Sequence, residues 1–160
     1  MYNISITEVR SILFFAPCPK RRSEKLKVIL CLDDRGGMTF NKRRQSRDRA
    51  VTEDIIKSAS GGRLVIAPFS EKLFPEGTAL TVLDNPLREA SADDSVFLEY
   101  GGLSGYENRV TGIIIYRWNK LYPSDTKIDI LPEELGLKRV STEEFAGYSH
   151  EKITKETYSV

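Results

Sequence analysis

Short apolar runs alternate with helix-like segments through the first two thirds of this chain, and only strand-like segments follow. A short apolar run bounded by turn residues is typical of a buried strand, whereas apolar residues spaced three or four apart among charges are typical of a helix. This order predicts an α/β fold with a mostly parallel central sheet and an antiparallel C-terminal hairpin. The predicted strands are 28–32, 64–67, 78–83, 96–100 and 112–116, the helices are 46–57, 70–74 and 86–90, and the tail strands are 127–130, 136–141 and 153–158.

Size and composition fit an ordinary soluble domain. The chain has 160 residues with 40% hydrophobic character, and its net charge of +1 argues against a dedicated polyanion binder. No apolar run approaches the length of a membrane span. Cys18 and Cys31 make no disulfide framework, so we expect a reduced, cytoplasmic protein. His150 is the one histidine and Asp33-Asp34 fits turn chemistry better than a Mg²⁺ site, so no metal is expected.

Residues 1–25 differ from the rest, and we expect them to be a disordered or mis-annotated extension before a single domain at 26–160. Their apolar stretch is too short for a membrane span and lacks the basic start of a signal peptide. Arg21-Arg22 can be encoded by a ribosome-binding sequence. Leu26 or Val28 is therefore a candidate for the true first residue.

The loop after the first predicted strand is the first candidate for a ligand site, because α/β proteins bind ligands at the carboxyl ends of their strands. It contains Gly36-Gly37 and then Phe40, which can stack on a heterocycle or pack under the loop. A dense cation cluster follows, which includes Arg43, Arg44 and Arg47. Arginine forks suit phosphates, so these residues are predicted to bind a nucleotide phosphate or RNA, and a solvated charged face is the equal alternative.

Several motifs occur in an order that resembles the dihydrofolate reductase family. They are Gly37-Met38 after the first strand, the stretch 64–74 with Ser70, the strand 96–100 ending in Gly101-Gly102 with Tyr106 four residues on, Asp125-Thr126, and a final hairpin within 136–158. The resemblance runs from about residue 27 to the C-terminus. It implies a dihydrofolate reductase-like three-layer sandwich that binds a nucleotide, with NADPH as its cofactor.

The resemblance also implies roles for single residues. The residues expected to line or cover the NADPH site are Met38, Phe40, Ser70, Gly101, Gly102 and Tyr106. A glycine pair at a strand end lets the backbone approach a pyrophosphate without obstruction by Cβ. Asp48 is the carboxylate nearest to the position of the family's proton-relay acid, and it is the candidate catalytic residue.

The chain departs from the family pattern at several of these positions. Asp48 is one residue out of register, Ala67 replaces the family's first cofactor glycine, and Pro68 replaces a cation that grips a phosphate. The folate-gripping arginine has no clear counterpart, and Tyr116 takes the place of a small hydroxyl residue. These departures point to an NADPH-dependent reductase of a non-folate small molecule, or to a fold that has lost the chemistry.

The chain also resembles short uncharacterised bacterial proteins that sometimes carry the name ribonuclease Z, through segments 32–46, 116–119, 122–123 and 149–154. That name implies a nuclease with clustered histidines on two zinc ions, which one histidine cannot build. The competing expectation is a non-catalytic or RNA-binding protein that uses the basic face of residues 43–49, although the near-zero net charge disfavours RNA. His150 is interpreted as an ordinary strand residue, since no nucleophile neighbours it in sequence.

Overall fold

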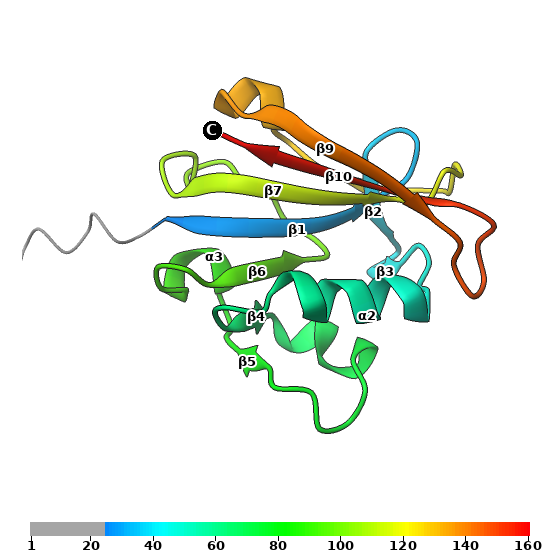
Figure 1. The fold of residues 1–160 in the computed structure, drawn as a ribbon, viewed down its shortest axis with the longest axis horizontal. Helices are drawn as coiled ribbons and strands as arrows, with labels where there is room; N and C mark the ends of the chain where they lie inside the picture. The colour runs from blue at the N-terminus through cyan, green and yellow to red at the C-terminus, as the bar shows by residue number, and fades with distance from the viewer. Residues whose placement is uncertain (1–24) are drawn as a thin grey trace, which may run out of the picture.

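The computed structural model describes residues 25–160, so the expectation for the N-terminal extension concerns residues that lie, apart from Lys25, outside this part. The strands of the central sheet are β1 (Leu26–Leu32), β4 (Leu64–Ile66), β5 (Thr81–Val82), β6 (Ser95–Leu98), β7 (Val110–Arg117), β9 (Lys138–Phe145) and β10 (Ile153–Ser159). Their spatial order is β5-β4-β6-β1-β7-β10-β9 (Figure 1). The first five in this order run parallel, and β10 runs antiparallel to β7 and β9. The predicted α/β fold, mostly parallel with an antiparallel C-terminal hairpin, is confirmed.

Helices and turns cover the two faces of this sheet. They are α2 (Arg49–Ser58), the 3-10 helix η2 (Pro68–Leu73), α3 (Pro86–Glu89) and the 3-10 helix η3 (Pro132–Leu135). In Figure 1, α2 crosses in front of the sheet, and the loop after β9 curls toward the start of this helix. None of the helices in residues 25–160 has the length and apolar character needed to cross a lipid bilayer.

The apolar side chains of β1 point alternately to the two faces of the sheet, where they belong to two separate core clusters. Val28 and Leu30 point to one face, where they pack with residues of α3, η3 and the loop near Leu103. Ile29 points to the other face and packs with residues of α2, including Ile55. Successive side chains of a strand point to opposite faces, so a strand that is apolar throughout must be covered on both sides.

A second, smaller sheet was not predicted. It consists of β2 (Gly37–Phe40), β3 (Arg43–Arg44) and β8 (Thr126–Lys127), in the order β3-β2-β8. Asn41 and Lys42 connect β2 to β3 with φ values of 50° and 61°, which suits a two-residue hairpin turn. The segment 127–130 was predicted to join the closing antiparallel strands. That prediction is wrong about the partner, because the strand at this place, β8, pairs with β2 in the smaller sheet. Local alternation indicates strand character, whereas the partner depends on contacts distant in sequence.

Candidate functional site

An ion pair joins the segments that follow two neighbouring parallel strands, β1 and β6. Gly36-Gly37 lies at the turn from β1 into β2, Gly101-Gly102 follows β6, and β1 pairs with β6. Nε and Nη2 of Arg44 each donate to a carboxylate oxygen of Glu99, at 2.8 Å and 2.8 Å. The hydroxyl of Ser70 donates to the same carboxylate at 2.6 Å. Arg44, predicted to bind a phosphate, and Ser70, predicted to line the cofactor site, therefore hold a carboxylate of this chain.

The buried carboxylate of Asp33 anchors the loop between β1 and β2. Its Oδ1 accepts hydrogen bonds from the amides of Arg35 at 2.8 Å and Gly37 at 2.7 Å. Its Oδ2 accepts from Nε2 of Gln45 at 3.0 Å and from the amide of Tyr122 at 3.2 Å. Burial opposes ionisation, but these hydrogen bonds hold the pKa of Asp33 below its usual value. The arrangement is the one expected of turn chemistry.

Asp48 caps the N-terminus of α2 and is also bound by the loop between β9 and β10. Its Oδ1 accepts from the amides of Ala50 and Tyr148, both at 2.9 Å. Its Oδ2 accepts from the amide of Ser149 at 2.8 Å and lies 3.0 Å from Nδ1 of His150. Burial opposes ionisation, but the bonds from His150 and the amides hold the pKa of this carboxyl well below its usual range. The catalytic role predicted for Asp48 stays a prediction. The geometry does not favour Asp48 as a proton donor, because its carboxylate accepts these hydrogen bonds in the ionised form.

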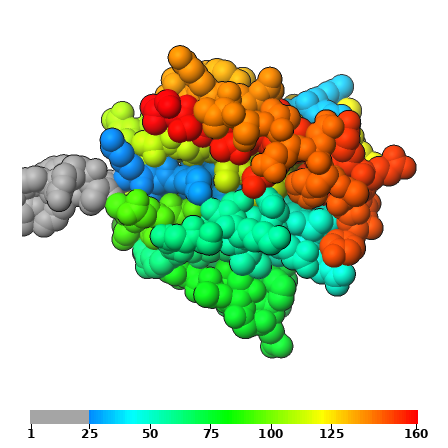
Figure 2. Space-filling model, in the orientation of Figure 1, coloured from blue at the N-terminus to red at the C-terminus, as the bar shows by residue number. Residues whose placement is uncertain are grey.

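His150 bridges this carboxylate to Ser46. Its Nε2 lies 2.9 Å from Oγ of Ser46 and 3.2 Å from the hydroxyl of Tyr122. Trp118 stacks on the imidazole at a centroid distance of 4.7 Å and an interplanar angle of 26°. Figure 2 shows the orange atoms of the loop after β9 against the cyan atoms around the start of α2. Sequence reasoning missed this cluster, because 102 positions separate His150 from Asp48.

The amides that follow Gly101-Gly102 already hold an anion of this chain. The amide of Leu103 donates to Oδ1 of Asp129 at 2.8 Å, and the amide of Ser104 donates to Oδ2 at 3.1 Å. A Cβ added at Gly102 would collide with the Asp129 carboxylate. The glycine pair therefore permits a close approach, as expected of it, and the group that approaches is an internal carboxylate.

A groove lies beside this region, between the β2–β3 hairpin and the ends of β4 and β6. It has a volume of about 530 Å³. Phe69 and Tyr100 meet in it edge to face, with ring centroids 5.3 Å apart. We call it the Phe69–Tyr100 groove, and its lining residues are Thr39, Lys42, Phe69, Tyr100, Asp125 and Thr126.

The other residues predicted for the site lie in different environments. Met38 is buried in the core and lines a small pocket beside Ser46, together with Arg44, Arg47 and Asp48. Phe40 is half exposed and lines a separate surface hollow with Arg43. Tyr106 is partly buried and packs against the core cluster on the face opposite α2. The predicted residues therefore do not line one common cavity.

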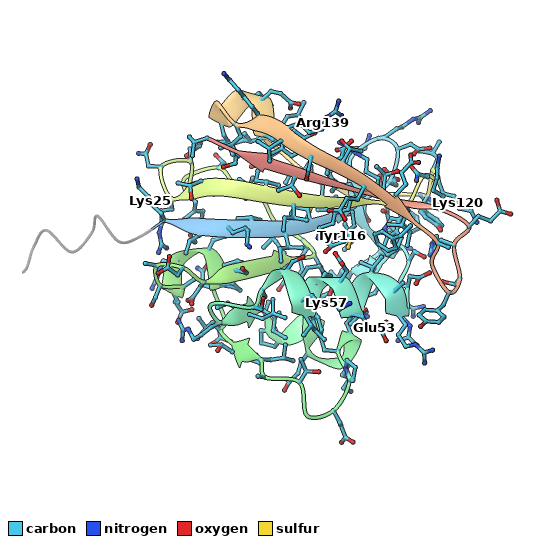
Figure 3. The ribbon with its side chains drawn as sticks, in the orientation of Figure 1. Lys25, Glu53, Lys57, Tyr116, Lys120 and Arg139 are labelled. Atoms are coloured by element: carbon cyan, nitrogen blue, oxygen red, sulfur yellow. The ribbon has the colours of Figure 1, made fainter. Side chains whose placement is uncertain are left out.

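Tyr116, which replaces a small hydroxyl residue of the family pattern, holds α2 against the sheet. Its side chain lies between β7 and α2 (Figure 3), and its hydroxyl donates to Oδ2 of Asp54 at 2.5 Å. Nζ of Lys155, on β10, lies 2.8 Å from the same oxygen. Burial and the Asp54 carboxylate both raise the pKa of Tyr116, so the phenol remains protonated. This partly buried contact fixes the helix whose N-cap is Asp48.

Among the described residues, no group of three or more His, Cys, Asp or Glu side chains is arranged to hold a metal ion. No family model and no curated protein matches the sequence. In structure, the chain is similar to dihydrofolate reductase from Enterococcus faecalis, solved in complex with NADP(H) and the compound RAB-propyl. The TM-score is 0.62 at 10% sequence identity, and the likeness covers 86% of this chain and 96% of that one. The chain has a dihydrofolate reductase-like fold, which confirms the predicted resemblance at the level of the fold.

Proposed function

We propose that this protein binds a small ligand that carries a planar heterocycle and a phosphate, such as a nucleotide, in the Phe69–Tyr100 groove. The observation that carries the proposal is the edge-to-face pair of Phe69 and Tyr100, which shares the groove with the cation of Lys42. Aromatic side chains can stack on any nucleotide base, because every base has a π-face. A cation in the same groove can neutralise the phosphate.

The size and place of the groove support this proposal. Its volume of about 530 Å³ falls within the range of about 300–1,000 Å³ that is usual for small-molecule sites. It lies beyond the carboxyl ends of β4 and β6, which are neighbours in the sheet. Open α/β sheets bind their ligands at this edge.

The phosphate of such a ligand is expected near Lys42 and Arg43 rather than at Gly101-Gly102. The amides after the glycine pair donate to Asp129, so this cradle does not fit a dinucleotide pyrophosphate while that carboxylate remains in place. Lys42 lines the groove and Arg43 is the exposed next residue. Binding through these cations differs from binding through a helix N-terminus.

NADPH is the first ligand to test, because the fold is similar to that of a reductase solved with NADP(H). When bound, NADPH supplies a hydride, and the activity that would follow is reduction of a small non-folate substrate. Met38, Arg47 and Asp48 line the small pocket beside Ser46 rather than the groove, so this proposal assigns none of them to that substrate.

The test is a titration of the native chain with NADPH, followed by the fluorescence of Trp118 and by the melting temperature. A ligand that binds only the folded state raises the melting temperature with its concentration. Phe69→Ala and Tyr100→Ala should each weaken binding by roughly 5- to 100-fold, which corresponds to the loss of one stacking contact. Tyr148→Ala is the matched control, because Tyr148 is an exposed aromatic residue that contacts Arg49 and does not line the groove.

ATP and GTP are titrated in parallel, so that a nucleotide site is separated from a site for NADPH alone. Saturable binding of ATP or GTP that depends on Phe69, without binding of NADPH, supports the nucleotide site and removes the reductase. If none of these compounds at millimolar concentration changes the fluorescence or the melting temperature, the proposed function is wrong.

A further inference from the structure

Ser46, His150 and Asp48 form a continuous hydrogen-bonded chain. Oγ of Ser46 lies 2.9 Å from Nε2 of His150, and Nδ1 on the other side of the ring lies 3.0 Å from Oδ2 of Asp48. Two places in the sequence supply them: the segment directly before α2, with Ser46 and the N-cap Asp48, and the loop between β9 and β10, with His150. A hydroxyl, an imidazole and a carboxylate in this order form the arrangement that activates a serine nucleophile.

The hydrogen bonds of Asp48 assign the protons along this chain. The carboxylate accepts from the amides of Ala50, Tyr148 and Ser149, which favours its ionised form. An ionised carboxylate can only accept, so Nδ1 of His150 carries the proton that points to Asp48. When the imidazole is neutral, Nε2 is then an acceptor to which the Ser46 hydroxyl can donate a hydrogen bond. These are the protonation states in which His150 can act as a general base.

The base is held firmly in this orientation. Trp118 stacks on one face of the imidazole, and the ring of His150 is buried. A Cβ at Gly147 would collide with the carboxylate of Asp48, so a glycine at this position leaves room for it. The hydroxyl of Tyr122 lies 3.5 Å from Oγ of Ser46 and completes the enclosure. A base whose orientation is fixed before the reaction loses little entropy when it acts.

We propose that Ser46 is a nucleophile that hydrolyses small carboxylic esters, with His150 as its general base and Asp48 as the residue that positions His150. Oγ of Ser46 attacks the carbonyl carbon and passes its proton to Nε2. The tetrahedral intermediate breaks its bond to the alcohol oxygen, which takes that proton and leaves. Water then attacks the acyl-serine and gives a proton to Nε2 of His150. The second tetrahedral intermediate breaks its bond to Oγ, which takes that proton back, and the carboxylic acid leaves. The sum is ester plus water to acid plus alcohol.

The surroundings of Ser46 limit the substrate. The pocket that it lines has only about 20 Å³ of free space, which is close to the room needed by one water molecule. A short acyl group is therefore expected rather than a long chain. Arg47 lines the same pocket. Its positive charge favours the oxyanion that develops on the attacked carbonyl.

The test is labelling of the native chain with diisopropyl fluorophosphate, a small reagent that esterifies activated serines and releases fluoride. Intact mass should show one added group, and peptide mapping should place it on Ser46. Chain unfolded in urea should not react, because the hydrogen-bonded chain to Asp48 is then lost. His150→Asn should remove the reaction, and Ser141→Ala, at an exposed serine of β9, should not.

Turnover of p-nitrophenyl acetate provides the second measurement. Ser46→Ala removes one hydroxyl and should leave the melting temperature nearly unchanged while the saturable rate falls by at least about 100-fold. If Ser46 in the folded native chain stays unlabelled, or Ser149 reacts in its place, the proposal is overturned. A saturable rate equal in Ser46→Ala and the native chain overturns it as well. This site does not depend on the nucleotide groove, and NADPH binding tests that groove separately.

Discussion

Nδ1 of His150 lies 3.0 Å from Oδ2 of Asp48, which ties the loop between β9 and β10 to the first turn of α2. Asp48 is therefore a helix cap and a contact between distant parts of the chain at the same time. The capping bond from the amide of Ala50 is local. The bonds from Tyr148, Ser149 and His150 hold the loop between β9 and β10 against the start of α2. Substitutions at this carboxylate should change stability as well as chemistry.

Asp48→Asn should lower the free energy of unfolding at pH 7 by about 1–3 kcal/mol, because charge-assisted bonds and part of the cap are lost. The pKa of Asp48 is depressed in the folded chain. Its contribution is therefore fully present above the pKa of an unfolded aspartate, about 3.9, and is lost as the pH falls below it. In urea unfolding, the difference between native and variant chains should shrink from pH 7 to about pH 3. Asp34→Asn, at an exposed carboxylate, is the control, and an equal difference at both pH values would contradict this expectation.

Arg44→Ala should destabilise the fold far more than Arg43→Ala. The Arg44 side chain is 23% exposed and its partner Glu99 is 7% exposed, so the substitution leaves a nearly buried carboxylate without its cation. The free energy of unfolding should fall by about 2–4 kcal/mol, which is close to the loss seen when one partner of a buried ion pair is removed. Arg43 is exposed, and its removal should cost less than about 0.5 kcal/mol. Urea unfolding measures both, and equal effects would show that the pair with Glu99 adds no stability.

Asp129→Asn should open the amides of Leu103 and Ser104 to an external anion. In the native chain these amides donate to the Asp129 carboxylate. The neutral amide of asparagine binds them more weakly, so pyrophosphate should raise the melting temperature of the variant and leave the native chain unchanged. Glu107→Gln, which alters the neighbouring carboxylate that accepts from Gly105, is the control. A response of the native chain equal to that of the variant would show that Asp129 does not block the cradle.

RNA binding through the basic face of residues 43–49 should be weak. Arg44 is paired with Glu99, and Arg49 lies over the ring of Tyr148 at 4.3 Å. Arg43, Arg47 and Arg49 are the exposed cations of this face. Fluorescence anisotropy with a labelled RNA should show little binding near 150 mM salt, on the order of physiological conditions, and a shallow salt dependence below it. A steep slope that Arg43→Ala reduces by about one unit would instead support the RNA-binding alternative.

The strands and their direction could be predicted because their signals are local. The apolar runs at 28–32 and 64–67 are buried strands, as short apolar runs bounded by turn residues indicate. Their alternation with helices implies parallel pairing. Parallel pairing in turn places Gly36-Gly37 and Gly101-Gly102 at one edge of the sheet. The β2–β3 hairpin was missed because its turn residues, Asn41 and Lys42, lack the glycine that usually signals such a turn.

The partners of individual side chains could not be predicted, because they depend on contacts distant in sequence. Ser70 and Arg44 carry groups that suit a phosphate, but the fold brings Glu99 between them. Asp48 does carry a local signal, since an aspartate directly before a helical segment is a preferred cap. Nothing local indicates that His150 reaches it, and the hairpin of β9 and β10 alone sets that contact.

The proposed nucleotide site is tested most directly by amide chemical shifts of the isotope-labelled native chain during a titration with NADPH, ATP and GTP. Saturable shifts are expected at Lys42, Phe69 and Tyr100, which line the groove. The amides of Leu103 and Ser104 should move little, because they stay bound to Asp129. Shifts confined to Leu103 and Ser104, or none at millimolar ligand, would contradict a nucleotide site between Phe69 and Tyr100.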